Sequence, residues 1–107
     1  GDVEGKNVLL ADDICSTGGT LLLAAKATQE KGAKRIFAAV THGIFANDTL
    51  QKIEQSPIEA LLVSNTIPIT GQKESSKIRT VSIAPLLAEG IHRVLSQKSI
   101  SSLYEIV

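Results

Sequence analysis

The chain has 107 residues, of which 43% are hydrophobic and 3% aromatic, and its eleven basic and eleven acidic side chains leave a formal net charge of zero. This length suits one domain with a modest aliphatic core, and the balanced charge with so few aromatic side chains argues against a nucleic-acid-binding surface. No apolar run approaches the roughly 20 residues that span a bilayer, so neither nucleic acid nor a membrane is expected as a partner.

The first predicted element is a strand over residues 8–11 (VLLA), an apolar run typical of a strand buried on both faces. It is followed at once by two acids, Asp12 and Asp13. Their carboxylates can accept hydrogen bonds from the vicinal hydroxyls of a sugar, or reach a magnesium ion through water. The pattern therefore predicts a polar ligand at the carboxyl end of this strand.

The turn after the acids combines hydroxyl side chains with glycine. Ser16, Thr17 and Thr20 supply hydroxyls, while Gly18 and Gly19 are expected to adopt positive φ so that backbone N–H groups converge on one point. The N-terminus of the following helix would add its free N–H groups and positive dipole end. We therefore expect phosphate or sulfate to bind here and a Gly19→Val replacement to abolish binding. The alternative is a plain solvated turn, but strand, acids, hydroxyl-glycine turn and helix occur in the order that builds a site.

The single cysteine, Cys15, lies between the acids and this turn. It cannot form an internal disulfide, which suits the reducing cytosol, and a cytoplasmic location is expected. The neighbouring acids disfavour a thiolate, so no redox role is expected.

A helix is predicted over residues 18–31, with Gly32 as the C′ residue that ends it. Its expected buried face consists of Leu21, Ala24, Ala25 and Thr28. Residues 35–41 form the next predicted strand, which a short right-handed crossover would place parallel to the first. This strand ends at His42, which is either a contact for a ligand or partner domain, or a turn histidine bonded to nearby backbone.

A short helix is expected over residues 48–55, with Asn47 as its N-cap. A third strand is predicted over residues 60–64. It ends at Asn65 and Thr66, which either contact a ligand or shape the rim of the sheet.

The most polar stretch, residues 70–77, is expected to be a solvated loop. Residues 78–83 alternate like a strand at or near the sheet edge, and Pro85 opens a last helix. The expected buried stripe of that helix consists of Leu86, Leu87, Ile91 and Leu95. The alternation of strands and helices predicts an α/β fold of three layers, with a parallel sheet between flanking helices.

Residues 12–20 (DDICSTGGT) resemble the phosphoribosyl-pyrophosphate loop shared by type I phosphoribosyltransferases and by ribose-phosphate pyrophosphokinases, also called PRPP synthetases. A departure is Ser16, where many members carry an acid. Four later segments resemble the C-terminal half of the PRPP synthetases: residues 41–45 (THGIF), 65–68 (NTIP), 77–89 (KIRTVSIAPLLAE) and 99–104 (SISSLY). This resemblance runs nearly end to end and implies a phosphoribosyltransferase-like, Rossmann-like fold.

The resemblance also implies a function. Residues 1–107 would be most of the C-terminal domain of a two-domain enzyme, whose absent N-terminal domain carries the ATP site and the basic catalytic loop. Such an enzyme uses Mg²⁺ and transfers pyrophosphate from ATP to ribose 5-phosphate, which gives phosphoribosyl pyrophosphate and AMP. Asp12 and Asp13 would hold the ribose hydroxyls and residues 16–20 the 5-phosphate, with no catalytic residue or metal ligand expected in this chain.

Two alternatives stay open, namely a type I phosphoribosyltransferase and a non-catalytic, synthetase-like regulatory subunit. The isolated chain is expected to lack synthetase activity. An uncovered sheet edge and apolar surface would favour association with a second copy or a missing domain, so a homo-oligomer is expected.

Overall fold

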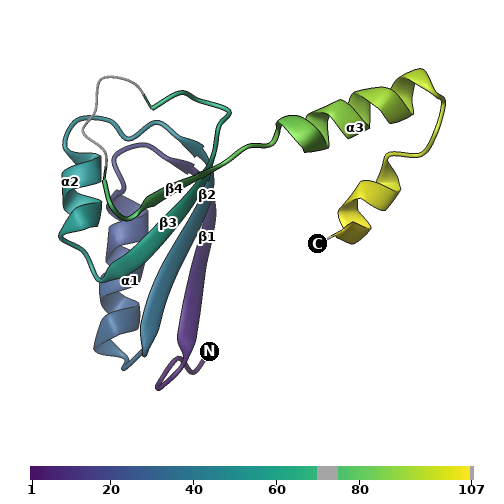
Figure 1. Ribbon diagram of the computed structural model, residues 1–107. Coiled ribbons are helices and arrows are strands. Elements are labelled where there is room, and N and C mark those ends of the chain that lie inside the picture. Colours follow the sequence, from purple (N-terminus) through teal and green to yellow (C-terminus); the bar gives the residue numbers. More distant parts are fainter. Residues whose placement is uncertain (70–74, 107) are drawn as a thin grey trace.

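A four-stranded parallel sheet forms the centre of the computed structural model, which describes residues 1–69 and 75–106 (Figure 1). The strands, in their order across the sheet, are β1 (Asn7–Cys15), β2 (Arg35–Gly43), β3 (Ile58–Ser64) and β4 (Ile78–Val81). The helices are α1 (Gly19–Glu30), α2 (Thr49–Glu54) and α3 (Ala84–Leu95), followed by a 3-10 helix over Ser101–Ile106. The predicted α/β class with a parallel sheet is therefore confirmed. Within the described ranges no helix is long and apolar enough to cross a membrane.

The acidic pair lies inside β1 rather than after it. The predicted strand over residues 8–11 is shorter than β1. The strand continues to Cys15 because β2 runs beside it and provides backbone partners up to that residue. Asp12 pairs with Val40 and Cys15 pairs with Gly43. The acids therefore lie within the paired part of β1, just before the glycine turn.

Other element boundaries differ by a few residues from those predicted. The N-cap of α2 is Asp48 and not Asn47, because Asn47 has φ 55 and lies in the left-handed region. The prediction that residues 78–83 lie at the sheet edge is confirmed for β4. Of the loop expected over residues 70–77, residues 70–74 lie outside the described residues.

The core lies between one face of the sheet and helices α1 and α2. Leu21 and Ala25 of α1 are buried there, as the helical spacing predicts, and so are Leu50 and Ile53 of α2. The sheet contributes the remaining large part of this cluster: Ile36, Ala38, Val40, Ile58, Leu61 and Val63. This packing fixes α1 and α2 against the sheet and holds the loops at their N-terminal ends.

The opposite face of the sheet is open. Leu9 and Leu62 alternate along their strands with core residues and are exposed. Phe37 on the same face is partly covered by Arg35, whose guanidinium carbon lies 5.0 Å from the ring centroid and which forms an ion pair with Glu59. The described residues thus build two of the three expected layers.

Helix α3 extends away from the sheet (Figure 1), so the prediction of a buried stripe on this helix is wrong. Leu86, Leu87, Ile91 and Leu95 are 53–80% exposed. The connection after β4 is held by the Asn65 side chain. The Asn65 side chain accepts a hydrogen bond from the backbone N–H of Ile83 (3.0 Å) and donates one to Ser82 Oγ (3.2 Å), which fixes the direction in which α3 leaves the sheet.

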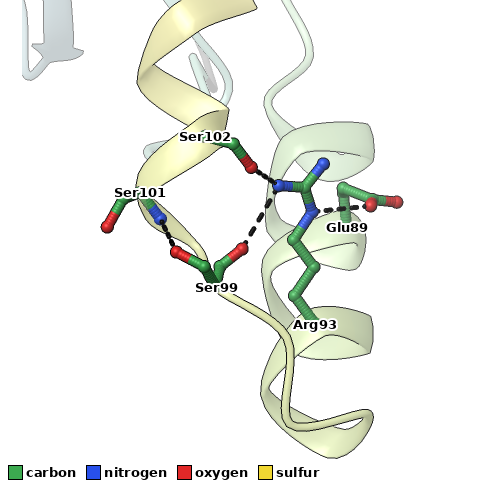
Figure 2. A network of polar contacts seen from close by, with 5 residues as sticks. All are labelled: Glu89, Arg93, Ser99, Ser101 and Ser102. Atoms are coloured by element: carbon green, nitrogen blue, oxygen red, sulfur yellow. Dashed lines mark hydrogen bonds and ion pairs between the residues drawn. The ribbon is translucent and has the colours of Figure 1, made fainter.

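The C-terminal segment packs on α3 through a polar network (Figure 2). Arg93 donates to Glu89 Oε1 (2.9 Å), to the backbone oxygen of Ser99 (3.3 Å) and to the hydroxyl of Ser102. The backbone N–H of Ser101 donates to Ser99 Oγ (3.2 Å). These bonds hold the 3-10 helix against α3.

We expect the isolated chain to associate, because it exposes more surface than a folded monomer of its size. Its accessible surface is 7358 Å², against about 5,700 Å² for a monomer of 11.3 kDa. The radius of gyration is 16.2 Å, against about 13 Å for this length. The excess of roughly 1,600 Å² exceeds the ~800 Å² that each partner contributes to a standard interface. Light scattering should show a mass above that of one chain, and a strict monomer at high concentration would contradict this prediction.

Candidate anion-binding site

A pocket lies where β1 ends and α1 begins. Six of the seven predicted site residues line it: Asp12, Ser16, Thr17, Gly18, Gly19 and Thr20. Ile14, Cys15 and Leu21 complete the lining. The remaining predicted residue, Asp13, is not part of the lining, although its side chain interacts with that of Asp12.

The backbone of the glycine turn leaves its donors free. Gly18 occupies the N-cap position of α1 without a side-chain cap, and the first turn of the helix holds no acid. Within residues 1–69 and 75–106, no acceptor is found for the amides of Thr17, Gly18, Gly19 and Thr20. Unpaired N–H groups together with the positive end of the helix dipole favour an anion at this point.

The two glycines of the turn have different roles. Gly18 has φ 78, as expected for a residue that reverses the chain. Gly19 is the first residue of α1 and is absent from the residues with positive φ, so the expectation of positive φ at this position is wrong. A Cβ at Gly19 would have only Thr17 Oγ1 nearby, at 3.8 Å. Gly18 is therefore the conformationally required glycine, and Gly19 keeps space open beside the free amides.

Each carboxylate of the acidic pair accepts a hydrogen bond from the backbone N–H of the next residue. Asp12 Oδ1 accepts a hydrogen bond from the backbone N–H of Asp13 (2.8 Å), and Asp13 Oδ1 accepts one from the N–H of Ile14 (2.8 Å). Hydrogen bonding to Asp12 and to the Ile14 N–H lowers the pKa of Asp13. An ionised carboxylate therefore stands at this strand end at neutral pH, close to a turn that favours an anion.

A magnesium ion fits this donor set only in part. The described residues hold no group of three or more His, Cys, Asp and Glu side chains that could bind a metal. Mg²⁺ is usually held by one or two carboxylates, by water and by substrate phosphates rather than by a full protein cage. Asp12 and Asp13 could provide the protein share of such a site.

The polar residues at the ends of β2 and β3 bond to one another and do not line the pocket. His42 Nδ1 lies 2.7 Å from Thr66 Oγ1, and Ser64 Oγ donates to the backbone oxygen of Thr41 (2.5 Å). The Asn65 side chain holds the connection to α3. For Asn65 and Thr66 these bonds favour the rim-shaping role over a ligand contact, and His42 bonds a side chain rather than backbone.

One buried residue beside the site has no counterpart among the residues predicted from the sequence. Thr49, at the start of α2, is 1% exposed and lies under the glycine turn. Its hydroxyl is 3.0 Å from the backbone oxygen of Ser16, 33 positions away in the chain. A threonine at the start of a short helix carries no sequence signal for such a contact.

Cys15 is expected to be unreactive in the folded chain. Its side chain is 2% exposed, and burial together with nearby Asp12 raises the pKa of the thiol. Iodoacetamide in slight excess at pH 8 should therefore leave Cys15 unmodified until urea unfolds the protein, as followed by mass spectrometry. Fast alkylation in native buffer would contradict the buried position.

Comparisons with known proteins support the resemblance. A protein-family model described as a phosphoribosyl synthetase-associated domain matches residues 1–105. The chain is 45% identical over 104 residues to a ribose-phosphate pyrophosphokinase of Aquifex aeolicus, and 45% identical over 105 residues to one of Listeria ivanovii. These alignments cover 97% and 98% of the chain but 33% of each relative. A crystal structure of phosphoribosylpyrophosphate synthetase from Mycobacterium smegmatis matches with a TM-score of 0.85 and 39% identity, over 91% of this chain and 33% of that one. The chain thus spans about a third of the length of these relatives.

Proposed function

The chain belongs to the phosphoribosyl synthetase-associated domain family, and we propose that it provides the ribose 5-phosphate site of a ribose-phosphate pyrophosphokinase. The observation that carries this proposal is the pocket in which free amides of the glycine turn and the carboxylate of Asp12 lie on the same lining. A sugar phosphate has the matching chemistry, with an anionic group at one end and vicinal hydroxyls at the other. The names of the relatives favour a synthetase over a phosphoribosyltransferase with a similar loop.

The turn would bind the 5-phosphate. Amides of Thr17 to Thr20 donate to phosphate oxygens, and the hydroxyls of Ser16, Thr17 and Thr20 can add further donors. The positive end of α1 adds to the attraction because phosphate carries close to two negative charges. Binding here fixes one end of the sugar.

The acids would fix the other end. Asp12 accepts hydrogen bonds from ribose hydroxyls, and Asp13 supplies a second carboxylate at the same strand end. A neutral sugar ring between the acids and the turn keeps the negative charges of carboxylate and phosphate apart. Ribose held at both ends presents its anomeric hydroxyl in one direction, which lowers the entropic part of the barrier to transfer.

The reaction of the whole enzyme would then follow. The anomeric oxygen of ribose 5-phosphate attacks the β-phosphorus of ATP and its hydroxyl proton is released to water. The bond from that phosphorus to the oxygen bridging it to the α-phosphorus breaks, and AMP leaves with that oxygen. When bound, Mg²⁺ would neutralise charge on the polyphosphate, and Asp12 and Asp13 could reach it through water. In this reaction the chain would position the acceptor sugar. We further propose that the whole enzyme is cytoplasmic and homo-oligomeric.

Calorimetric titration tests the binding part of the proposal. Ribose 5-phosphate should bind more tightly than inorganic phosphate, and ribose should not bind measurably, because the phosphate provides the charged contacts. Equal affinities for ribose and ribose 5-phosphate would contradict the site.

The chain alone should release no AMP from ATP and ribose 5-phosphate, because the resemblance assigns the ATP site and the basic catalytic loop to the other domain.

A chimera tests the catalytic part. The matching third of the Aquifex aeolicus enzyme can be replaced by this chain, since the two align over 97% of it. The chimera should release AMP in a coupled assay. A folded but inactive chimera that still binds ribose 5-phosphate would favour the non-catalytic subunit instead.

A further inference from the structure

A buried hydroxyl lies directly beneath the anion-binding turn. Thr49 Oγ1 is 3.0 Å from the backbone oxygen of Ser16 and 2.5 Å from that of Ala46. Its single proton can be donated to one of these oxygens or shared between them. Its methyl carbon lies under Gly18, where an added Cβ would approach it to 3.1 Å. Thr49 thus touches the turn with both branches of its side chain.

Residues 44–49, here called the bracing segment, hold two successive carbonyl groups of the turn. The backbone N–H groups of Ile44 and Phe45 donate to the oxygen of Cys15 (3.0 and 3.1 Å), and that of Ala46 donates to the oxygen of Ser16 (2.9 Å). The Thr49 hydroxyl lies within hydrogen-bond distance of the same Ser16 oxygen. Both carbonyls therefore point into the bracing segment.

The direction of a carbonyl fixes the direction of the next amide. A trans peptide is planar, so its C=O and N–H bonds point in opposite directions. With the Ser16 carbonyl held by the bracing segment, the N–H of Thr17 points the other way, toward the pocket that Thr17 lines. The bond from Thr49 thereby acts on an amide that it does not touch.

The bracing segment is itself held firmly. Phe45 and Asn47 have φ 48 and 55, a region that side-chain-bearing residues adopt at a cost. Phe45 is buried in the core, and its ring would lie 2.4 Å from a Cβ at Gly43. A segment so fixed can transmit a definite position to the turn rather than follow its movements.

We propose that Thr49 is a positioning residue of the anion-binding turn. Its hydroxyl orients the Thr17 amide through the Ser16 carbonyl, and its methyl sets the position of Gly18. This role rests on the proposed function of the turn, but the orientation of the backbone can be measured without any ligand.

Two variants separate the two branches of the side chain. Thr49→Val keeps the methyl against Gly18 and removes the hydroxyl, whereas Thr49→Ser keeps the hydroxyl. We expect Thr49→Val to weaken ribose 5-phosphate binding about tenfold, as for one lost hydrogen bond, and Thr49→Ser to restore affinity to within about twofold. The matched control is Thr28→Val, which removes a part-buried hydroxyl bonded to the Ala24 oxygen (2.6 Å) in α1 and should leave affinity unchanged.

Amide hydrogen exchange without ligand supplies the second readout. Thr49→Val should speed exchange at Thr17 and Gly18 relative to Thr28→Val of similar stability. If the wild type does not bind ribose 5-phosphate, the proposed function is wrong. The amide hydrogen exchange rates of Thr17 and Gly18 still test the role of Thr49 in that case. Unchanged affinity and unchanged exchange in Thr49→Val would overturn the proposal. If that variant does not fold, Thr49→Ala replaces it, because alanine favours helix, and wild-type affinity in Thr49→Ala would equally overturn it.

Discussion

Gly18→Val is expected to lower the free energy of unfolding by about 2–6 kcal/mol and to abolish ribose 5-phosphate binding. A β-branched residue at φ 78 costs about 1–3 kcal/mol in backbone strain. The new Cβ would lie 3.1 Å from Thr49 Cγ2 and 3.4 Å from Leu22 Cδ1, and overpacking of this kind costs a further ~1–3 kcal/mol. Urea unfolding and calorimetric titration measure the two effects.

Gly19→Ala is the matched control for this variant. Its Cβ would meet only Thr17 Oγ1, at 3.8 Å, and alanine in the first turn of α1 should leave stability unchanged or raise it by up to ~1 kcal/mol. If Gly18→Val were as stable as Gly19→Ala and bound the sugar phosphate normally, the conformation of the turn described above would be wrong.

Asp12→Asn is expected to weaken ribose 5-phosphate binding about ten- to a hundredfold and to leave inorganic phosphate binding unchanged or slightly tighter. The amide replaces an anionic acceptor of sugar hydroxyls by a mixed donor and acceptor. Its Oδ1 can still accept the N–H of Asp13, which Asp12 accepts now at 2.8 Å, so the strand end should keep its shape. Loss of a nearby negative charge favours phosphate.

Asp2→Asn provides the control, because Asp2 also accepts a backbone N–H, that of Glu4 at 3.1 Å, but lies at the N-terminal turn. This variant should bind both ligands like the wild type. Equal loss of phosphate and ribose 5-phosphate in Asp12→Asn would place the acid at the phosphate and not at the sugar.

Local patterns in the sequence predicted most of the fold. The order of strands and helices is correct, Gly32 has φ 87 after α1 as its C′ role requires, and Pro85 lies at the start of α3. Such features depend on a few neighbouring residues, which the sequence displays directly. The exposure of α3 was not predictable in the same way. Its apolar stripe indicates a face to be covered, but not what covers it or in which direction the chain leaves β4.

In the site, too, the local features could be predicted and the features that depend on distant contacts could not. The turn residues are adjacent in the sequence, so their convergence on one pocket could be predicted. Positive φ was expected at both glycines, and only Gly18 of the two adopts it. Asp13 lies outside the lining, and the strand pairing that extends β1 through both acids depends on β2, which is distant in the sequence. Thr49 could not be found, because its contact with Ser16 depends on how α2 packs under a turn 33 residues earlier.

Backbone amide shifts during a titration test the central claim most directly. In the ¹⁵N-labelled chain, addition of ribose 5-phosphate should move the signals of Thr17, Gly18, Gly19 and Thr20 most, with a smaller change at Asp12, while inorganic phosphate should move the turn signals and leave Asp12 in place. Shifts confined to another part of the chain, or no shift in the turn at saturating ribose 5-phosphate, would contradict the assignment of this turn as the sugar-phosphate site.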